Sequence, residues 1–271
     1  MTPGDATGRD KIVTRIITVA SHKGGTGKTT TAVTLAHGLA MRGYRTLIVD
    51  LDSQGNVAAF LDLPLTDDLM KLVALEIPLE SVTTPTGWEN MWIVSSNEQT
   101  ARLKLPLSAM DFRELVLARA LKDAQFDYVF LDCAPSLDIL QVAAFVASDW
   151  LLIPVQVDYA AVLGCRQVLS SLARVHDAGY TQVKLLGLLP TFYERVTKES
   201  EAQLKAIVDR FGDVALDPIP KDVKLREAPA YGLTIWEHAP KSRAVVGFDI
   251  GKGQMIGGYQ AALGRVIRET A

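Results

Sequence analysis

The sequence predicts an α/β fold, a doubly wound and mostly parallel sheet with helices on both faces. Two observations carry this prediction. Short apolar runs rich in β-branched residues alternate with helical patterns almost to the end of the 271 residues. In addition, a glycine-rich segment, SHKGGTGKTTT at residues 21–31, lies between the first predicted strand and the first predicted helix.

Six segments have the length and composition of strands. Most are apolar throughout, which is typical of parallel strands that helices cover on both faces. The predicted strands are residues 15–20, 45–50, 91–96, 127–132, 150–155 and 184–189.

The helical patterns fill the intervals between these strands. The first, residues 28–45, is expected to be closed by Gly43 as its C-terminal cap. A glycine-rich stretch at 247–258 is expected to be a loop. The other predicted helices are residues 109–124, 161–177, 199–211 and 256–269.

The composition is that of one large globular domain. Hydrophobic residues make up 48% and charged residues 22%, enough to bury a sizeable core. We expect residues 1–14 to form a flexible tail and residues 15–271 to form a single domain. The net charge of -3 gives no global basic signature, so any nucleic-acid surface must be local.

Several protein classes are disfavoured. Cys133 and Cys165 cannot build a disulfide framework and suggest a reduced compartment, and the four histidines lack metal-ligand spacing. The chain opens without a signal-peptide pattern, and no apolar run approaches the roughly 20 residues of a membrane span. The sequence therefore predicts a cytoplasmic protein.

The glycine-rich segment has the pattern of a phosphate-binding loop. Gly24, Gly25 and Gly27 would let backbone N–H groups surround phosphates at the start of a helix. Lys28 would reach the β- and γ-phosphates, and Thr29 would ligate Mg²⁺. The neighbouring Thr26 and Thr30 complete the predicted ATP- or ADP-binding loop.

The loop departs from the general pattern in two places. His22 stands where the first glycine is usual, and Lys23 follows it. The order Lys-Gly-Gly-x-Gly-Lys-Thr resembles the deviant Walker A motif of the ParA/MinD family of P-loop ATPases. The resemblance implies an ATP-bound homodimer in which Lys23 contacts the phosphates held by the partner subunit. Without the resemblance, Lys23 could simply be a solvated loop lysine.

A second segment, LIVDLDSQGN at residues 47–56, resembles the family's switch motif, with Ser53 in place of the usual proline. The resemblance implies that Asp52 positions the attacking water and that Asp50 supports the Mg²⁺ shell. Taken alone, the two aspartates could equally belong to an ordinary strand-end turn.

A third segment, YVFLDCAPS at residues 128–136, resembles a Walker B strand. The resemblance implies that Asp132 holds Mg²⁺. Ala134 replaces a proline that is common in the family, but the carboxylate is retained. Cys133 has no adjacent histidine to activate it, and we expect it to be a small buried residue.

The remainder of the chain most resembles the chromosomal, Soj-like ParA proteins. By that resemblance, Arg195 and Lys224 match DNA-contacting arginines, and Pro220 matches a residue near the adenine. A lysine retains the charge for phosphate contact but loses the bidentate fork of arginine. Three further cations could extend this surface or could simply be solvated: Lys198, Lys221 and Arg226.

The resemblance implies a nucleoid-associated ATPase with weak basal turnover. It would bind nonspecific double-stranded DNA in its ATP state and position a plasmid, chromosome or protein organelle. A ParB-like partner would stimulate hydrolysis. The alternative is a MinD-like membrane-associated regulator, but the C-terminal segment 258–271 fits core packing better than membrane insertion. A third interpretation, a nucleotide-gated binding module with negligible turnover, is disfavoured by Asp52.

Overall fold

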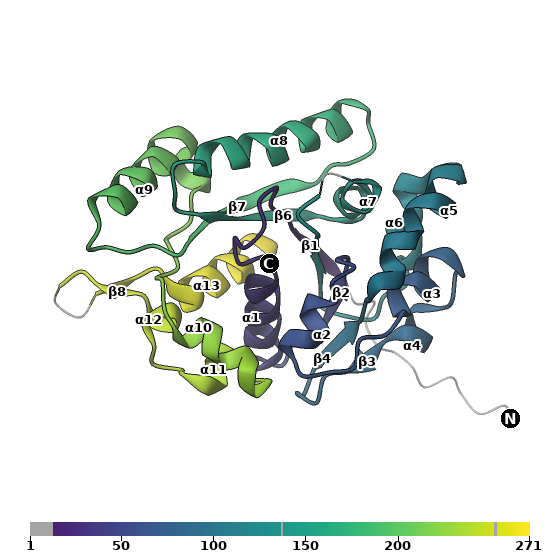
Figure 1. Cartoon of the computed structure of the whole chain (residues 1–271), viewed down its shortest axis with the longest axis horizontal. Coiled ribbons are helices and arrows are strands. Elements are labelled where there is room, and N and C mark those ends of the chain that lie inside the picture. Colours follow the sequence, from purple (N-terminus) through teal and green to yellow (C-terminus); the bar gives the residue numbers. More distant parts are fainter. Residues whose placement is uncertain (1–12, 137, 252–253) are drawn as a thin grey trace, which may run out of the picture.

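The computed structural model describes residues 13–136, 138–251 and 254–271. A seven-stranded sheet runs through the centre of the molecule, with helices on both faces (Figure 1). The strand order is β3-β4-β2-β5-β1-β6-β7, and every pairing is parallel except that of β3 with β4. The predicted fold class is confirmed. The predicted tail falls almost entirely outside the described residues.

All six predicted strands are present, within two residues at each end. A seventh strand, β3, is too short to be predicted from its sequence. The strands are β1 Arg15–Val19, β2 Thr46–Asp50, β3 Thr84–Pro85, β4 Met91–Val94, β5 Tyr128–Asp132, β6 Trp150–Gln156 and β7 Lys184–Thr191.

The α-helices divide between the two faces of this sheet and its flanks. Shorter 3-10 turns lie at 98–103, 113–115, 212–214 and 228–231. The α-helices are α1 Lys28–Ala40, α2 Asn56–Phe60, α3 Asp68–Ala74, α4 Leu79–Val82, α5 Lys104–Ala109, α6 Val116–Ala120, α7 Ile139–Ala147, α8 Ala161–Asp177, α9 Lys198–Phe211, α10 Lys224–Glu227, α11 Ile235–His238, α12 Arg243–Val246 and α13 Gly258–Thr270.

Two hydrophobic cores follow from the alternation of side chains along the strands. Leu47 and Val49 of β2 face a core built with α3 to α9, whereas Ile48 faces a core built with α1, α2 and α11 to α13. Residues of β5 divide in the same way, with Leu131 in the first core and Phe130 in the second. The sheet is thus buried on both sides, which explains why its strands are apolar throughout.

The predicted helix at 109–124 is wrong. Two short helices, α5 and α6, stand in its place, because Met110 is extended and Phe112 takes a left-handed conformation with φ 55°. The chain turns between them so that Leu107 and Leu117 enter the same core. A turn that tertiary packing imposes on a phenylalanine leaves little trace in the local pattern.

Other helix predictions need smaller corrections. The first helix ends at Ala40, and Gly43 follows in a left-handed turn instead of capping it directly. The helix α7 was not predicted, although Asp138 caps its N-terminus by accepting from Leu140 N at 3.1 Å. The expected loop at 247–258 contains a small hairpin, β8 Phe248–Asp249 with β9 Met255–Ile256.

Both edges of the sheet are closed to further strands. On one side, β3 has only two residues, and its Pro85 has no backbone N–H. On the other side, a following segment covers β7: Leu216 N donates to Leu188 O at 2.8 Å, and Ile219 N donates to Pro190 O at 2.8 Å. No helix within the described ranges combines the length and apolarity that a transmembrane span requires.

Candidate functional site

The phosphate-binding loop follows β1 directly and leads into α1. Gly25 (φ 74°) and Gly27 (φ 86°) are both left-handed, a conformation that disfavours any other residue. A Cβ placed on Gly24 or Gly25 would meet no atom within 4 Å, so the loop borders open space. This cradle at the start of a 13-residue helix fits a chain of phosphates.

Lys28 is the first residue of α1 and is 8% exposed. Burial lowers the pKa of its ammonium, while Asp132, Cys133 and Asp52 act in the opposite direction. Its Nζ donates to the backbone oxygen of Lys23 at 3.4 Å. The loop therefore holds a partly desolvated cation that a phosphate could pair with.

Thr29 and Asp132 meet where β5 ends beside α1. The Thr29 hydroxyl donates to Asp132 Oδ2 at 2.6 Å. Asp132 is almost fully buried, and its other oxygen, Oδ1, has no hydrogen-bond partner among the described residues. Burial raises the pKa of Asp132 to about 7, although the Thr29 hydrogen bond and Lys28 lower it. A hydroxyl beside a carboxylate with a vacant acceptor fits Mg²⁺ or a water bound to it.

Asp50 lies beside Asp132 because β2 and β5 pair in register at these two residues. Its Oδ1 accepts from Asp52 N at 3.0 Å, and its Oδ2 accepts from Val57 N at 3.0 Å. Burial and the neighbouring Asp132 raise the pKa of Asp50 well above its ordinary value. Both oxygens already accept backbone N–H groups, so this geometry fits shaping of the segment that carries Asp52 better than direct metal contact.

Asp52 follows β2 and is 9% exposed. Its Oδ1 accepts from Gln54 N at 3.0 Å, and its Oδ2 accepts from Asn56 Nδ2 at 3.4 Å. The fully buried Ser96 donates its hydroxyl to the backbone oxygen of Asp52. Asp52 is thus fixed through both its side chain and its backbone.

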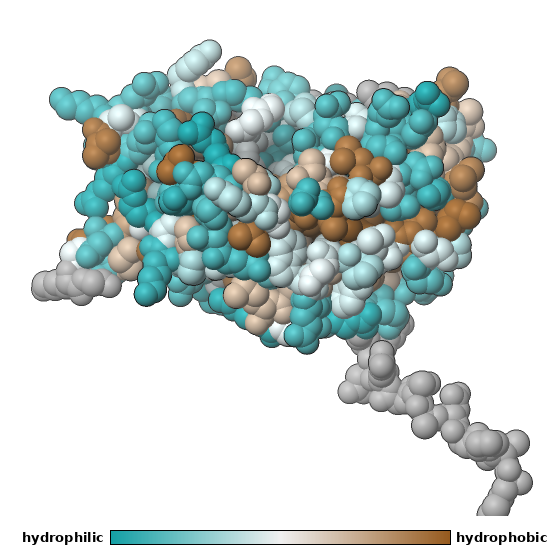
Figure 2. Space-filling model, turned by 60° about the horizontal axis from the view of Figure 1, so that its bottom comes forward, coloured by the Kyte–Doolittle hydropathy of each residue, from teal (hydrophilic) through white to brown (hydrophobic). Residues whose placement is uncertain are grey.

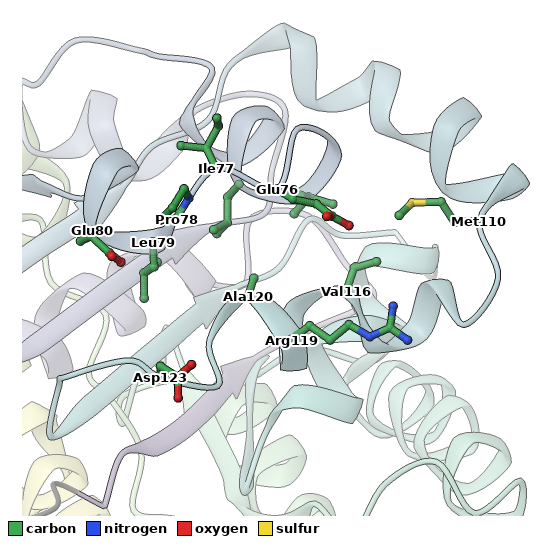
Figure 3. A pocket seen from close by; sticks show the side chains of 12 residues that line it. Glu76, Ile77, Pro78, Leu79, Glu80, Met110, Val116, Arg119, Ala120 and Asp123 are labelled. Atoms are coloured by element: carbon green, nitrogen blue, oxygen red, sulfur yellow. The ribbon is translucent and has the colours of Figure 1, made fainter.

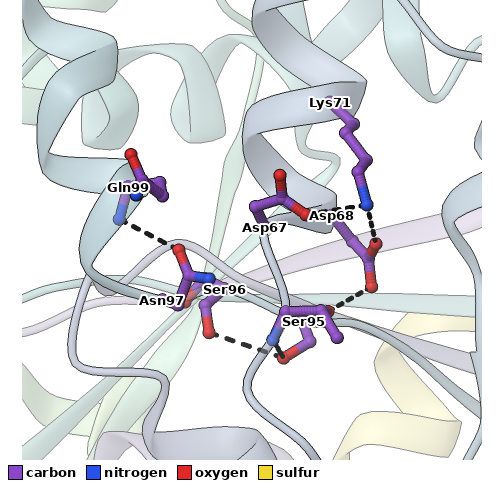
Figure 4. A network of polar contacts seen from close by, with 8 residues as sticks. Asp67, Asp68, Lys71, Ser95, Ser96, Asn97 and Gln99 are labelled. Carbon is purple, nitrogen blue, oxygen red and sulfur yellow. Dashed lines mark hydrogen bonds and ion pairs between the residues drawn. The ribbon is translucent and has the colours of Figure 1, made fainter.

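Ser96 was not predicted from the sequence. It lies just beyond β4, next to Ser95 (Figure 4). The backbone oxygen of Ser95 accepts a hydrogen bond from Leu69 N of α3 at 2.9 Å. In the same network, Lys71 pairs with Asp67 at 2.7 Å. A signal was available, because polar residues directly after a parallel strand lie at the edge where ligands bind.

Lys23 pairs within its own chain. Its Nζ contacts Asp158 Oδ2 at an exposed position of the loop. Asp158, a residue that the sequence analysis did not select, follows β6, and its other oxygen accepts from Ala160 N at 3.0 Å. In this single chain, Lys23 is therefore held by a carboxylate of its own subunit.

A cavity of about 530 Å³ opens beside the phosphate loop. Gly27 and Thr30 line it at the loop, and Phe192 and Pro220 line it on the opposite side. Thr26 joins the two sides, since its backbone oxygen accepts from the Thr191 hydroxyl at 2.9 Å. The lining of the cavity is mixed, since Lys221, Arg226 and three other charged residues line it beside the apolar and aromatic ones. The apolar and aromatic part, next to the phosphate cradle, fits a nucleobase.

The five predicted DNA-contacting residues are all exposed, and the structure brings some of them together. Tyr193 pairs with Pro220, which places Arg195 and Lys221 on adjacent segments. Lys224 and Arg226 lie on α10, and Lys198 begins α9.

Acidic groups neutralise part of this surface. Lys221 pairs with Glu194 at 3.1 Å, and Lys224 pairs with Glu227 at 2.6 Å. Arg195 donates to a backbone oxygen, that of Asp249, at 3.0 Å. The surface is therefore mixed in charge, and a polyanion would have to displace two carboxylates to use both lysines.

The sequence as a whole matches a known family. The AAA domain family matches residues 14–185, which include the phosphate loop, both aspartate segments and Asp158. The chromosome-partitioning ATPase Soj of Thermus thermophilus is 38% identical over 84% of this chain and 90% of its own length. The chain belongs to the ParA/MinD family of P-loop ATPases.

Solved structures share the fold of this chain. The apo structure of McdA from Cyanothece superposes with a TM-score of 0.78 at 22% identity, covering 83% of this chain and 93% of McdA. Cobyrinic acid a,c-diamide synthase from Mycobacterium smegmatis, with bound ADP and magnesium, has a TM-score of 0.73 at 30% identity, covering 83% and 96%. The ParA/MinD fold of this chain therefore accompanies bound nucleotide in at least one similar structure.

Proposed function

We propose that this chain is a Mg²⁺-dependent ATPase with weak basal turnover that forms a homodimer in its ATP state and binds double-stranded DNA without sequence preference. One observation carries the enzymatic part. The vacant oxygen of Asp132, the Thr29 hydroxyl and the buried Lys28 converge at the end of β5, while Asp52 is fixed at the end of the neighbouring β2.

The proposed roles follow from this arrangement. Lys28 and the loop glycines hold the phosphates, and Thr29 with Asp132 holds Mg²⁺, which when bound offsets charge on the transferring phosphoryl group. Asp52 orients the attacking water and accepts hydrogen bonds that fix its own carboxylate. Asp50 holds the Asp52 segment through two backbone N–H groups.

The proposed dimer requires Lys23 to change partner. It leaves Asp158 of its own subunit and pairs with phosphates bound by the other subunit, which adds positive charge where the transition state is most anionic. The γ-phosphate supplies contacts that hydrolysis removes, so ATP shifts the population toward the dimer.

The proposed cellular role is the positioning of a plasmid, chromosome or protein organelle on the nucleoid, with a ParB-like partner that stimulates hydrolysis. The named similarity to a chromosome-partitioning ATPase supports this proposal. Arg195, Lys198, Lys221, Lys224 and Arg226 form the proposed contact with DNA phosphates.

The test is retardation of unrelated DNA fragments by the purified protein with ATP, ADP or no nucleotide, combined with an ATP hydrolysis assay. We expect DNA binding only with ATP, lost in Lys23→Gln and Lys224→Ala and weakened by salt. We expect hydrolysis to be lost in Asp52→Asn. ATP-dependent pelleting with anionic liposomes, without DNA retardation at low salt, would instead support a MinD-like regulator.

A further inference from the structure

Lys23 is held at two points within the single chain. Its backbone oxygen accepts from Lys28 Nζ at 3.4 Å, and its side chain pairs with Asp158 Oδ2. The first contact uses the cation that the proposed nucleotide site assigns to the phosphates, so a bound nucleotide competes with it. The second contact does not involve Lys28, so Lys28 can move to the phosphates without breaking it.

The fold places Asp158 within reach of Lys23. The strands β1 and β6 are parallel neighbours, with Val19 opposite Leu152, so the loops that follow them leave the same edge of the sheet. Asp158 Oδ1 accepts from Ala160 N at 3.0 Å, which fixes the carboxylate just before α8 and leaves Oδ2 for Lys23. The side chain of Asp158 is 20% exposed and that of Lys23 is 47% exposed. The contact therefore lies at the surface, where phosphates of a second subunit could replace it.

We propose that Asp158 restrains Lys23 in the single subunit and thereby sets the protein concentration at which ATP assembles the dimer. This inference rests on the homodimer proposed above. Each subunit must release its Lys23 before that lysine reaches phosphates held by the other subunit, so every dimer requires two broken contacts. A partly exposed ion pair shifts an equilibrium by about threefold, and two of them shift it by about tenfold. The dimer then depends on a ligand that offers Lys23 more negative charge than one carboxylate does.

The substitution Asp158→Asn tests the restraint with little change in the shape of the loop. The amide retains an oxygen that can accept from Ala160 N, but it lacks the charge that pairs with Lys23. Lys23 would therefore be released while the turn before α8 is kept.

Two control variants also remove one carboxylate from the chain, whose net charge of -3 opposes the association of two copies. Asp209→Asn breaks an ion pair with Lys205 on α9, which is 2.7 Å long. Asp123→Asn removes an exposed carboxylate at a cavity between the α3–α4 segment and α6, away from the phosphate loop (Figure 3). An effect of net charge alone would be equal in all three variants.

The first measurement is the reactivity of lysine amines in the protein without nucleotide. A short exposure to an N-hydroxysuccinimide ester of acetic acid acetylates accessible amines, and mass spectrometry quantifies the product at each lysine. We expect acetylation of Lys23 to rise about twofold or more in Asp158→Asn and to stay unchanged in both controls, since only the first variant frees this amine. Lys205 should respond only to Asp209→Asn. Unchanged acetylation of Lys23 in Asp158→Asn would overturn the restraint.

The second measurement is the dissociation constant of the dimer with ATP and Mg²⁺, from sedimentation velocity over a series of protein concentrations. Every protein also carries Asp52→Asn, so that ATP is not consumed. We expect Asp158→Asn to lower the constant about tenfold and both controls to stay within about twofold. An equal decrease in all three variants would overturn the proposal, and so would an unchanged constant. A higher constant would overturn it as well, because Asp158 would then stabilise the dimer.

The same series without nucleotide separates this dimer from association of other kinds. Figure 2 shows apolar side chains in a band over the half of the molecule that contains α2 to α6, where Leu75 is 64% exposed and Leu105 is 80% exposed. Association through such apolar surface requires no ATP. If none of the proteins forms an ATP-dependent dimer, the proposed function is wrong and the restraint on assembly is wrong with it, whereas the acetylation of Lys23 still reports the contact with Asp158. Thermal unfolding verifies that each variant is folded.

Discussion

At the scale of single residues, the site depends on side chains that fix the position of Asp52 through hydrogen bonds to its backbone. Asp50 has no free oxygen and acts on the segment that carries Asp52. The hydroxyl of the fully buried Ser96 is bonded to the backbone oxygen of Asp52 and not to its carboxylate. Such residues do not touch a nucleotide, but a small displacement of a reacting group lowers a rate steeply.

Removing the Ser96 hydroxyl should therefore slow hydrolysis without weakening ATP binding. We expect Ser96→Ala to lower kcat by about tenfold and to leave KM for ATP almost unchanged, since Asp52 loses one of its constraints. The measurement is steady-state phosphate release under saturating Mg²⁺ and, separately, ATP affinity by calorimetry.

The adjacent serine supplies the control. Ser95→Ala removes a hydroxyl that accepts from Thr66 N at 3.4 Å and does not touch Asp52. An equal loss of kcat in both variants would show that the effect is general destabilisation of this region. If Asp52→Asn leaves hydrolysis intact, the proposed role of Asp52 is wrong. The role proposed for Ser96 is then wrong as well, because Ser96 acts through Asp52.

At the scale of elements, short segments bring distant residues together. The turn at Gly55 is an example, because it lies between β2 and α2 and packs against the end of β4. Gly55 has φ 64°, and a Cβ there would lie 2.6 Å from Leu65 Cδ2 and 2.8 Å from Ser96 O. This turn therefore tolerates neither a left-handed alanine nor its extra volume.

We expect Gly55→Ala to lower the free energy of unfolding by about 2 kcal/mol or more, from backbone strain and overpacking combined. Gly87→Ala is the matched comparison, since Gly87 has φ 92° but a Cβ there meets no atom within 4 Å. Gly87→Ala should lower the free energy of unfolding only by the backbone strain, about 1 kcal/mol. Urea unfolding followed by circular dichroism measures both, and equal costs would contradict the close approach at Gly55.

The helix α10 yields another prediction at this scale. Lys224 pairs with Glu227 one turn along, and this contact raises the pKa of Lys224 and lowers that of Glu227. Glu227→Gln should release the lysine and strengthen DNA binding about twofold to fivefold at low salt. Anisotropy with labelled duplex DNA in the presence of ATP measures this change, with Glu201→Gln as a control on α9. A weaker affinity in Glu227→Gln would indicate that Lys224 does not face DNA.

The six longer strands and the phosphate loop could be predicted from sequence because each is encoded locally, by a continuous apolar run or by glycines in fixed order. The position of Ser96 at the end of a strand could be read from the sequence, but its contact with Asp52 could not. That contact and the contact of Asp158 with Lys23 join residues 44 and 135 positions apart. The break near Phe112 escaped prediction for the same reason, because it is imposed by the packing of Leu107 and Leu117 into one core. The two ion pairs that neutralise the proposed DNA surface also depend on three-dimensional placement.

At the scale of the whole molecule, buried carboxylates link stability to pH. Asp132 has a pKa of about 7 in the folded chain, above its unfolded value of about 4. Between these two values the folded state holds a proton that the unfolded state has released. The free energy of unfolding should therefore fall as the pH rises from about 4 to about 7 and should then level off for this group.

Asp132→Asn should remove the part of the pH dependence of the free energy of unfolding that Asp132 causes. The nucleotide-free variant should therefore be more stable than the unaltered protein above pH 7. Its Mg²⁺-dependent hydrolysis should be lost. The difference in the free energy of unfolding between the variant and the unaltered protein should grow by up to about 1.4 kcal/mol per pH unit between about pH 4 and about pH 7. Urea unfolding at pH 5, 6, 7 and 8 with EDTA present measures it. Parallel curves for the two proteins would show that Asp132 does not carry the linkage.

The closed edges of the sheet have a consequence for how copies of this chain can meet. An open edge invites a strand from another molecule, which leads to continuous sheets and, at high concentration, to fibres. Here Pro85 blocks one edge, and the segment at residues 215–219 occupies the other. At the seven-stranded sheet, association between copies would therefore use side chains and loops, whose contacts a bound ligand can reverse, in contrast to a growing backbone ladder.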